Sequence, residues 1–300
     1  MRLSTLAQTI AGAIVAVLAL GGAANAPSTG SRLAFTSNRD GTTQIYMMNG
    51  DGTGVVRLTG TGSNAAPAFS PDGRQIAFQA LRDGTWQVYL MNADGGGAVR
   101  LTSPPGNSAE PAFRPDGRRI AFDSNRFGIW QIYLMNTDGS GVTPLTASRT
   151  NAFSPAYHPD GRTIVFVSIR EGGSVLATIR ADGTRERVLA GPPGGRHGPT
   201  FSPDGRRIAF SAGRTGDEQI YVAAADGSHL TQLTKGPGIS FGPAFSPDGR
   251  WIAFTSDRDG QDQIYVMQAD GSQVVRLTGP PGASFFPTFQ PDVPLAASHR

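Results

Sequence analysis

The side chains best suited to catalysis are few and widely separated. The chain has no cysteine, which excludes a disulfide framework, a thiolate metal site and a cysteine nucleophile. No histidine has a second one three or four residues away, and no His-Glu-x-x-His motif occurs. The four histidines are His158, His197, His229 and His299. We therefore expect no catalytic residue, no metal site and no cofactor.

Asp-Gly pairs are frequent, and one stretch, NGDGTG at Asn49–Gly54, resembles part of a calcium loop. It lacks the series of oxygen ligands and the closing glutamate that such a loop needs. An Asp-Gly pair also stands at the same place in every copy of a repeat. Because aspartate bonds its own backbone and glycine accepts positive φ, we interpret these pairs as turns.

The repeat is long and regular. Copies of a string like AFSPDGRQIAF occur along the chain, followed by strings like QVYLMNADG and then, in most copies, by Leu-Thr. The prolines of the first string are each 44 residues apart: Pro71, Pro115, Pro159, Pro203, Pro247 and Pro291. Self-similarity at a period of about 40–45 residues is typical of a propeller array.

Each repeat predicts four short strands and no helix. In the first complete copy these are PAF, RQIAFQA, TWQVYLM and AVRLT, separated by Pro-Asp-Gly and Asp-Gly turns. Ile76 and Phe78 share one face of the second strand by the period-two rule. Four strands in 44 residues match a propeller blade, so the predicted fold class is all-β, a six-bladed β-propeller of four-stranded blades.

The two ends of the repeat region complement each other. The first copy begins at Arg32 without a leading strand, and FPTFQPDV at 286–293 is a leading strand with nothing after it. We expect the C-terminal strand to complete blade one and close the ring, which removes exposed sheet edges. The predicted organisation is a signal peptide at 1–26, a linker at 27–31, the propeller at 32–293 and a tail at 294–300.

The N-terminus has the pattern of an export signal. Residues 1–26 contain one arginine, an apolar run from Ile10 to Leu20, and the small-residue ending Ala24-Asn25-Ala26. This is typical of a Sec-type signal peptide. The run is short for a membrane span, so we expect no span in the mature chain and a periplasmic or secreted location. Because Pro27 follows the best cleavage site, cleavage slightly earlier and retention as an anchor are alternatives.

The charge pattern gives no sign of nucleic-acid binding. Net charge is +3, and most arginines recur at fixed places, such as Arg74, Arg118 and Arg162 after the first turn. We interpret them as solvated or ion-paired blade residues. A nucleic-acid partner would need a basic cluster or stripe, and none is visible.

The strings FSPDGRRIAF and SDRDGQDQIYVMQADGSQVVRLT, with their copies, resemble the TolB-type six-bladed propeller repeat over residues 32–292. TolB carries an α/β domain before its propeller, whereas here we expect the signal peptide to lead directly into the first blade. The resemblance implies a periplasmic or secreted propeller that binds a protein, such as an outer-membrane lipoprotein of the Pal type. The repeat occurs in several functional settings, and fold alone does not fix function.

Function should lie where the repeats differ. In propellers of this strand order, the loops entering the first strand open onto the central channel. The two positions before each first-strand proline vary, and we predict a binding site there for a protein or peptide. The candidate residues are Phe153, Arg196, His197, Phe241, Phe285, Phe286 and Glu110. An exposed aromatic arc would be a binding anchor; alternatively, the rings pack between adjacent blades.

The predicted function is therefore an exported, monomeric protein-interaction scaffold without enzymatic activity. Two alternatives remain open. One is an enzyme of the lyase, lactonase or glycan-processing kind, which would need acidic and histidine groups such as Glu110 and His197 to converge. The other is a secreted carbohydrate-binding module, which exposure of Trp86 and Trp130 would favour and their burial would disfavour. Blade four departs from the others at Val175–Ala177, which indicates either repeat decay or a groove.

Overall fold

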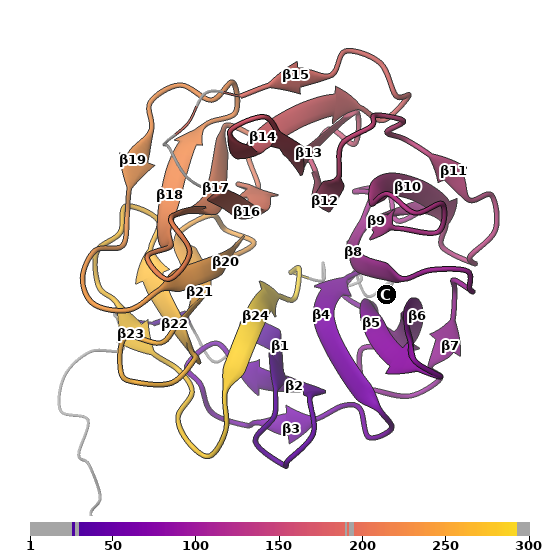
Figure 1. The fold of residues 1–300 in the computed structure, drawn as a ribbon. Helices are drawn as coiled ribbons and strands as arrows, with labels where there is room; N and C mark the ends of the chain where they lie inside the picture. Colours follow the sequence, from indigo (N-terminus) through magenta and orange to yellow (C-terminus); the bar gives the residue numbers. More distant parts are fainter. Residues whose placement is uncertain (1–25, 28–29, 190, 192–194, 293–300) are drawn as a thin grey trace, which may run out of the picture.

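The computed structural model describes residues 26–27, 30–189, 191 and 195–292, with only the backbone for Gly195 and Arg196. These residues form six four-stranded antiparallel sheets arranged in a ring (Figure 1), and the described part contains no helix. The predicted six-bladed propeller is confirmed. The predicted signal peptide, apart from Ala26, and the tail lie outside the described residues.

The strands of each blade run outward from the channel. The innermost strands are β4 (Ser63–Phe69), β8 (Ser108–Phe113), β12 (Ala152–Tyr157), β16 (Gly195–Phe201), β20 (Ser240–Phe245) and β24 (Ser284–Phe289). The second strands are β1 (Arg32–Ser37), β5 (Gln75–Arg82), β9 (Arg119–Ser124), β13 (Thr163–Arg170), β17 (Arg207–Gly213) and β21 (Trp251–Ser256). The third strands are β2 (Gln44–Asn49), β6 (Thr85–Asn92), β10 (Gln131–Asn136), β14 (Gly173–Arg180), β18 (Gln219–Ala224) and β22 (Gln263–Gln268). The outer strands have two residues each: β3 (Val56–Arg57), β7 (Val99–Arg100), β11 (Thr143–Pro144), β15 (Arg187–Val188), β19 (Thr231–Gln232) and β23 (Val275–Arg276).

Blade A joins strands from both ends of the chain, as the sequence predicts. Its order is β24-β1-β2-β3, and β24 pairs with β1 antiparallel, with Leu33 opposite Phe289 and Thr36 opposite Phe285. The Ser37 hydroxyl donates to the Ala283 carbonyl at 2.7 Å, which joins the start of β24 to the end of β1. We call the remaining blades B to F in chain order, beginning with β4–β7.

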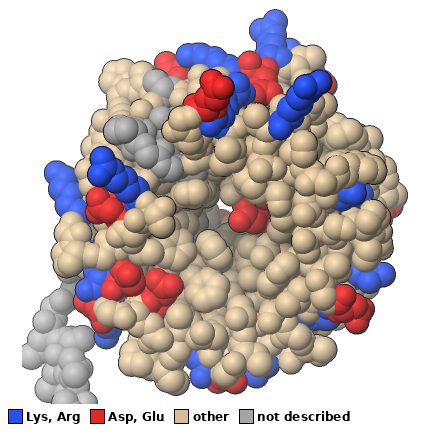
Figure 2. All heavy atoms as spheres, in the orientation of Figure 1, with Lys and Arg blue, Asp and Glu red and all other residues tan. Residues whose placement is uncertain are grey.

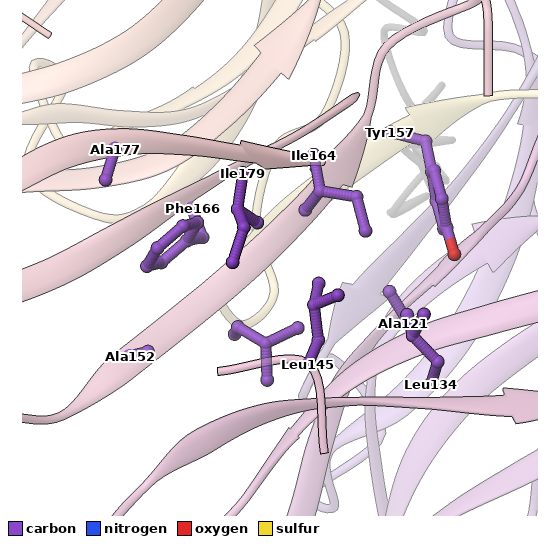
Figure 3. Packing of buried hydrophobic residues seen from close by; sticks show 10 residues of the cluster. Ala121, Leu134, Leu145, Ala152, Tyr157, Ile164, Phe166, Ala177 and Ile179 are labelled. Carbon is purple, nitrogen blue, oxygen red and sulfur yellow. The ribbon is translucent and has the colours of Figure 1, made fainter. Parts of the chain in front are cut away.

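The core consists of apolar layers between neighbouring blades. Each second strand contributes one fully buried phenylalanine: Phe35, Phe78, Phe122, Phe166, Phe210 and Phe254. Five of them pack against a tyrosine of the third strand, with ring centroids 5.7–6.0 Å apart. In blade D the position opposite Phe166 is Ala177. Figure 3 shows how Phe166, Ile164 and Ile179 of blade D face Leu134 and Ala121 of blade C.

The Asp-Gly pairs form the predicted turns. In the first string, the Ser70 hydroxyl and the Arg74 N–H both donate to Asp72 Oδ1. In the second, Gly95 has φ +91°, and a Cβ there would lie 2.7 Å from the Leu58 carbonyl oxygen of the preceding blade. This position therefore requires glycine both for its φ and for the close approach of two blades.

The loops that enter the innermost strands share one face with the loops between second and third strands. The Asn38 N–H donates to the Ala283 carbonyl, and Asn107 N–H donates to Asn125 Oδ1 at 2.7 Å. This face therefore surrounds the end of the channel where each innermost strand begins.

Candidate binding site at the channel mouth

Every innermost strand has a bulge at the residue that precedes its proline. The pairing with the second strand shifts register there, and φ is positive, between +48° and +60°. The six positions, which we call the bulge ring, are Ala66, Glu110, Ser154, Gly198, Gly242 and Phe286. Positive φ is unfavourable for residues with a Cβ, and four of the six have one. A bulge redirects its side chain, here toward the channel.

Side chains of the preceding blade hold the bulges in place. The Ser154 N–H donates to Asp123 Oδ2 at 3.1 Å, and the Glu110 N–H donates to Gln79 Oε1 at 3.1 Å. Ala66 and Phe286 donate in the same way to the threonine hydroxyls of Thr36 and Thr255. All four acceptors immediately follow the buried phenylalanine of a second strand. These hydrogen bonds satisfy backbone donors that the bulge removes from the ladder, and they connect neighbouring blades.

The bulge ring encloses a cavity of about 510 Å³, and all six of its residues line the cavity. The prolines that follow five of them contribute to the wall: Pro67, Pro111, Pro155, Pro243 and Pro287. A largely apolar hollow of this size with a few polar groups is typical of a ligand site. Four of the ring positions hold alanine, serine or glycine, which leaves the centre open.

One wall of the cavity is acidic. Glu110 keeps part of its surface open to the cavity although protein surrounds its carboxyl group, which lies beside the carboxyl of Asp123 and the hydroxyl of Ser154. Burial raises the pKa of Asp123 well above its usual range, and the charge of Glu110 raises it further. Burial also raises the pKa of Glu110, against the opposing effects of Ser154 and His197. Both carboxyl groups are therefore harder to ionise than a free carboxyl.

The opposite wall is aromatic. The ring of Phe286 lies edge-on to Phe241, with centroids 5.8 Å apart, and edge-on to Phe285 at 5.4 Å. Gly242 makes room for it, because a Cβ at Gly242 would lie 3.2 Å from Phe286 Cδ1. Phe286 is 37% exposed, in contrast to the buried phenylalanines of the core. Phe286 thus combines partial exposure with the positive φ that all six bulge positions share.

The structure separates the predicted site residues into two groups. Glu110, His197, Phe241 and Phe286 line the cavity. Phe153 packs instead against the apolar layer between blades D and E and against Trp130, with centroids 5.7 Å apart. Phe285 is half-buried beside Phe286, and the side chain of Arg196 lies outside the described residues. The arc is thus partly a cavity wall and partly packing.

Asp123 escaped the sequence analysis, although a signal for it exists. The residue after the buried phenylalanine is polar in five blades: Thr36, Gln79, Asp123, Ser211 and Thr255. A polar residue at that place in a buried strand needs a partner. For Asp123 the partners lie on β8, the neighbouring strand of its own blade, and on β12 of the next blade.

A Gly-x-Ser-x-Gly string is also present, at Gly238–Gly242. Ser240 stands at the start of β20 and is 1% exposed. Its hydroxyl donates a hydrogen bond to the hydroxyl of Ser256. This is a strand within a blade and has none of the geometry of a nucleophile elbow. Within the described ranges, no three His, Cys, Asp or Glu side chains come close enough to share a metal ion.

The remaining expectations concern tryptophans, arginines and membrane segments. Trp86 and Trp130 are both half-buried. The arginines after the first turn are exposed, as the sequence predicts, and Leu176 and Ala177 of blade D are buried. No helix able to cross a membrane exists among the residues described.

Comparison with known proteins gives a family and a fold. The family described as the TolB beta propeller domain matches residues 59–192 and 134–295, together well over half of the chain. No curated protein matches the sequence.

Among solved structures, TolB from Acinetobacter baumannii superposes with a TM-score of 0.78 at 22% identity, covering 88% of this chain and 67% of that one. A protein assigned as TolB from Agrobacterium tumefaciens superposes with a TM-score of 0.70 at 23% identity, and the match covers 84% of this chain and 90% of that one. A chain of a nidogen–laminin complex superposes with a TM-score of 0.70 at 15% identity, and the match covers 87% of this chain and 98% of that one. At these identities the likeness is one of fold.

Proposed function

Because this chain belongs to the TolB beta-propeller family, we propose that it is a protein-interaction scaffold that acts without catalysis in the periplasm or outside the cell. The partner, a protein or peptide, occupies the channel-mouth cavity. The observation that carries this proposal is the aromatic pair of partly exposed Phe286 and half-buried Phe241, which lines a cavity of about 510 Å³. Aromatic side chains at the centre of a concave surface are common binding anchors.

The test is a crosslinking pull-down from envelope extract with the mature chain as bait. A second bait carries Phe241→Ala and Phe286→Ala, and a matched control carries Val56→Ala and Val99→Ala, which remove exposed apolar side chains from outer strands. We expect the wild type and the control to recover one protein, an outer-membrane lipoprotein of the Pal type, and the phenylalanine variant to lose it. Recovery of nothing by folded wild-type bait, or equal recovery by all three, contradicts the proposal.

Export rests on the signal-like composition of residues 1–26. Fractionation of cells that express the full chain, with intact-mass measurement of the product, tests it. We expect a protein outside the cytoplasm that lacks about 25 N-terminal residues, as such signals are 15–30 residues long. A full-length product in the cytoplasm contradicts this part of the proposal.

A further inference from the structure

The charge of the cavity differs from that of the rest of the molecule. The chain has a net charge of +3, yet the charged residues lining the cavity are Glu110 and Glu218, and no described lining residue is lysine or arginine. In Figure 2 the basic side chains lie toward the periphery of this face, and an acidic side chain borders the central opening. A negative hollow in a positive protein favours a cationic occupant.

The pair of Glu110 and Asp123 places one carboxyl group, that of Glu110, at the edge of that hollow. Asp123 is 2% exposed, and its Oδ1 receives no hydrogen bond from an N–H or hydroxyl group. Its Oδ2 accepts the Ser154 N–H, which fixes the carboxyl behind Glu110. Glu110 is the member that reaches the cavity. Removing a carboxylate from water costs free energy unless hydrogen-bond donors or a cation replace the water. The protein provides few such groups around the Glu110 carboxylate.

The other side of the cavity suits an apolar stem. Gly242 and Gly198 contribute no side chains, and the ring of Phe286 covers Gly242. Phe241 belongs to blade F and Phe286 to blade A, three and two blades from Glu110 of blade C, so the aromatic wall and the acid lie on different sides of the ring. Lysine and arginine combine a cationic end with an apolar stem, and both stack favourably on aromatic rings.

We propose that the channel-mouth cavity receives one basic side chain, arginine or lysine, of the bound protein, with its cationic end on Glu110 and its stem against Phe286 and Phe241. This inference rests on the proposed function and specifies what the partner must contribute. Asp123 lies beside Glu110 and does not itself line the cavity. His197 also lines the cavity.

The test uses small probes in place of the unidentified partner. N-acetyl-arginine methylamide and the corresponding citrulline amide, which is nearly isosteric but neutral, are titrated into the mature protein at pH 7.5 with EDTA present, and binding is followed by NMR. We expect the arginine probe to bind at least about tenfold more tightly, since a charge-assisted hydrogen bond in a desolvated site is worth that much. Equal behaviour of the two probes, including no binding of either, overturns the inference.

A variant series locates the site. Glu110→Gln should weaken the arginine probe about tenfold, while Glu171→Gln, an exposed acid of blade D, should leave its affinity unchanged. If both variants bind the probe as wild type does, the inference fails. The two proposals can fail separately. If the protein binds the arginine probe but the pull-down recovers nothing, the cation site stands and the scaffold role fails. If the pull-down recovers a protein in a Phe241-dependent way but the arginine probe binds no better than the citrulline probe, only the scaffold role stands.

Discussion

Two rings of residues run around this molecule, and they differ in almost every respect. The buried phenylalanines are identical in all six blades, and none is more than 1% exposed. The bulge ring, one strand closer to the axis, contains five different residue types and lines the cavity. The core ring is uniform because each blade must pack on the next in the same way. The bulge ring does not pack on a neighbour in this way, so it is free to vary.

The largest expected effect is the difference in stability loss between truncating a phenylalanine of the core ring and truncating one of the bulge ring. Phe210→Ala should lower the free energy of unfolding by about 3–5 kcal/mol, because it leaves a cavity between two blades. Phe286→Ala should lower it by less than half as much, because Phe286 is already 37% exposed. Urea unfolding of both variants measures the difference. Equal losses would show that the bulge ring is structural.

The carboxyl pair should give stability an unusual pH dependence. Burial raises the pKa of both Asp123 and Glu110, so the folded state binds protons more tightly than the unfolded state. Their contribution is favourable below the ordinary carboxyl pKa and is lost as pH rises through the raised values. Asp123→Asn, which mimics the protonated form, should flatten this decline at pH values above the ordinary carboxyl pKa. The test is the free energy of unfolding of both proteins measured at a series of pH values. If its slope against pH is the same in the variant as in the wild type, the raised pKa of Asp123 is contradicted.

The turn aspartates provide an internal contrast to that pair. The Ser70 hydroxyl lowers the pKa of Asp72, and Ser202 does the same for Asp204. Their stabilising contribution is present above the ordinary carboxyl pKa and is lost as pH falls through the lowered values. The two groups therefore act in opposite directions and in different pH ranges, which allows one titration to separate them.

Two glycines of the bulge ring should respond differently to alanine. Gly198→Ala and Gly242→Ala both place a Cβ at positive φ, a strain of about 1 kcal/mol that Ala66 already accepts in blade B. Only at Gly242 would the new atom meet an aromatic ring, at 3.2 Å from Phe286. We expect Gly242→Ala to be the more destabilising and to weaken binding of the arginine probe, with Gly198→Ala as the matched control. Identical effects would mean that the ring of Phe286 moves freely.

The smallest effect concerns an exposed loop of blade C. In blades A and F, Asp40 and Asp259 accept a hydrogen bond from the third-strand tyrosine at 2.6 Å. In blade C this place is taken by Phe127, which is 82% exposed. Phe127→Asp should raise stability by up to about 1 kcal/mol, the usual net value of a hydrogen bond.

The same substitution should also move a titration. The aspartate partner contributes to raising the pKa of Tyr46 and Tyr265 to about 12. Tyr133 has no such partner, so Phe127→Asp should raise its pKa further. Ultraviolet titration of the variant against the wild type tests this, and an unmoved Tyr133 would show that the loop of blade C differs in shape from those of blades A and F.

The repeat was sufficient to predict the ring, because spacing and turn chemistry are local properties that recur in each blade. It also located the cavity, since position relative to the proline fixes which residues reach the channel. It could not distinguish Phe286, which lines the cavity, from Phe285 and Phe153, which pack beside neighbours. Phe286 stands at a bulge with positive φ, whereas Phe241 lines the cavity from the position that Phe285 and Phe153 also occupy, so neither residue type nor position separates the two groups. The pairing of Glu110 with Asp123 was also missed. The two residues lie on adjacent strands of blade C, where Asp123 pairs with Ala109 and the bulge follows at Glu110.

Closure of blade A by β24 has a consequence for the order of synthesis. Strand β1 begins at Arg32, and its inner partner begins at Ser284, about 250 residues later. At about 5–20 residues per second, the first strand made waits roughly 13–50 s for its partner to be translated. Each of the other five blades is encoded by a continuous stretch and can pair as soon as that stretch is complete. The first strand of the propeller to be synthesised is therefore the last to gain its inner neighbour.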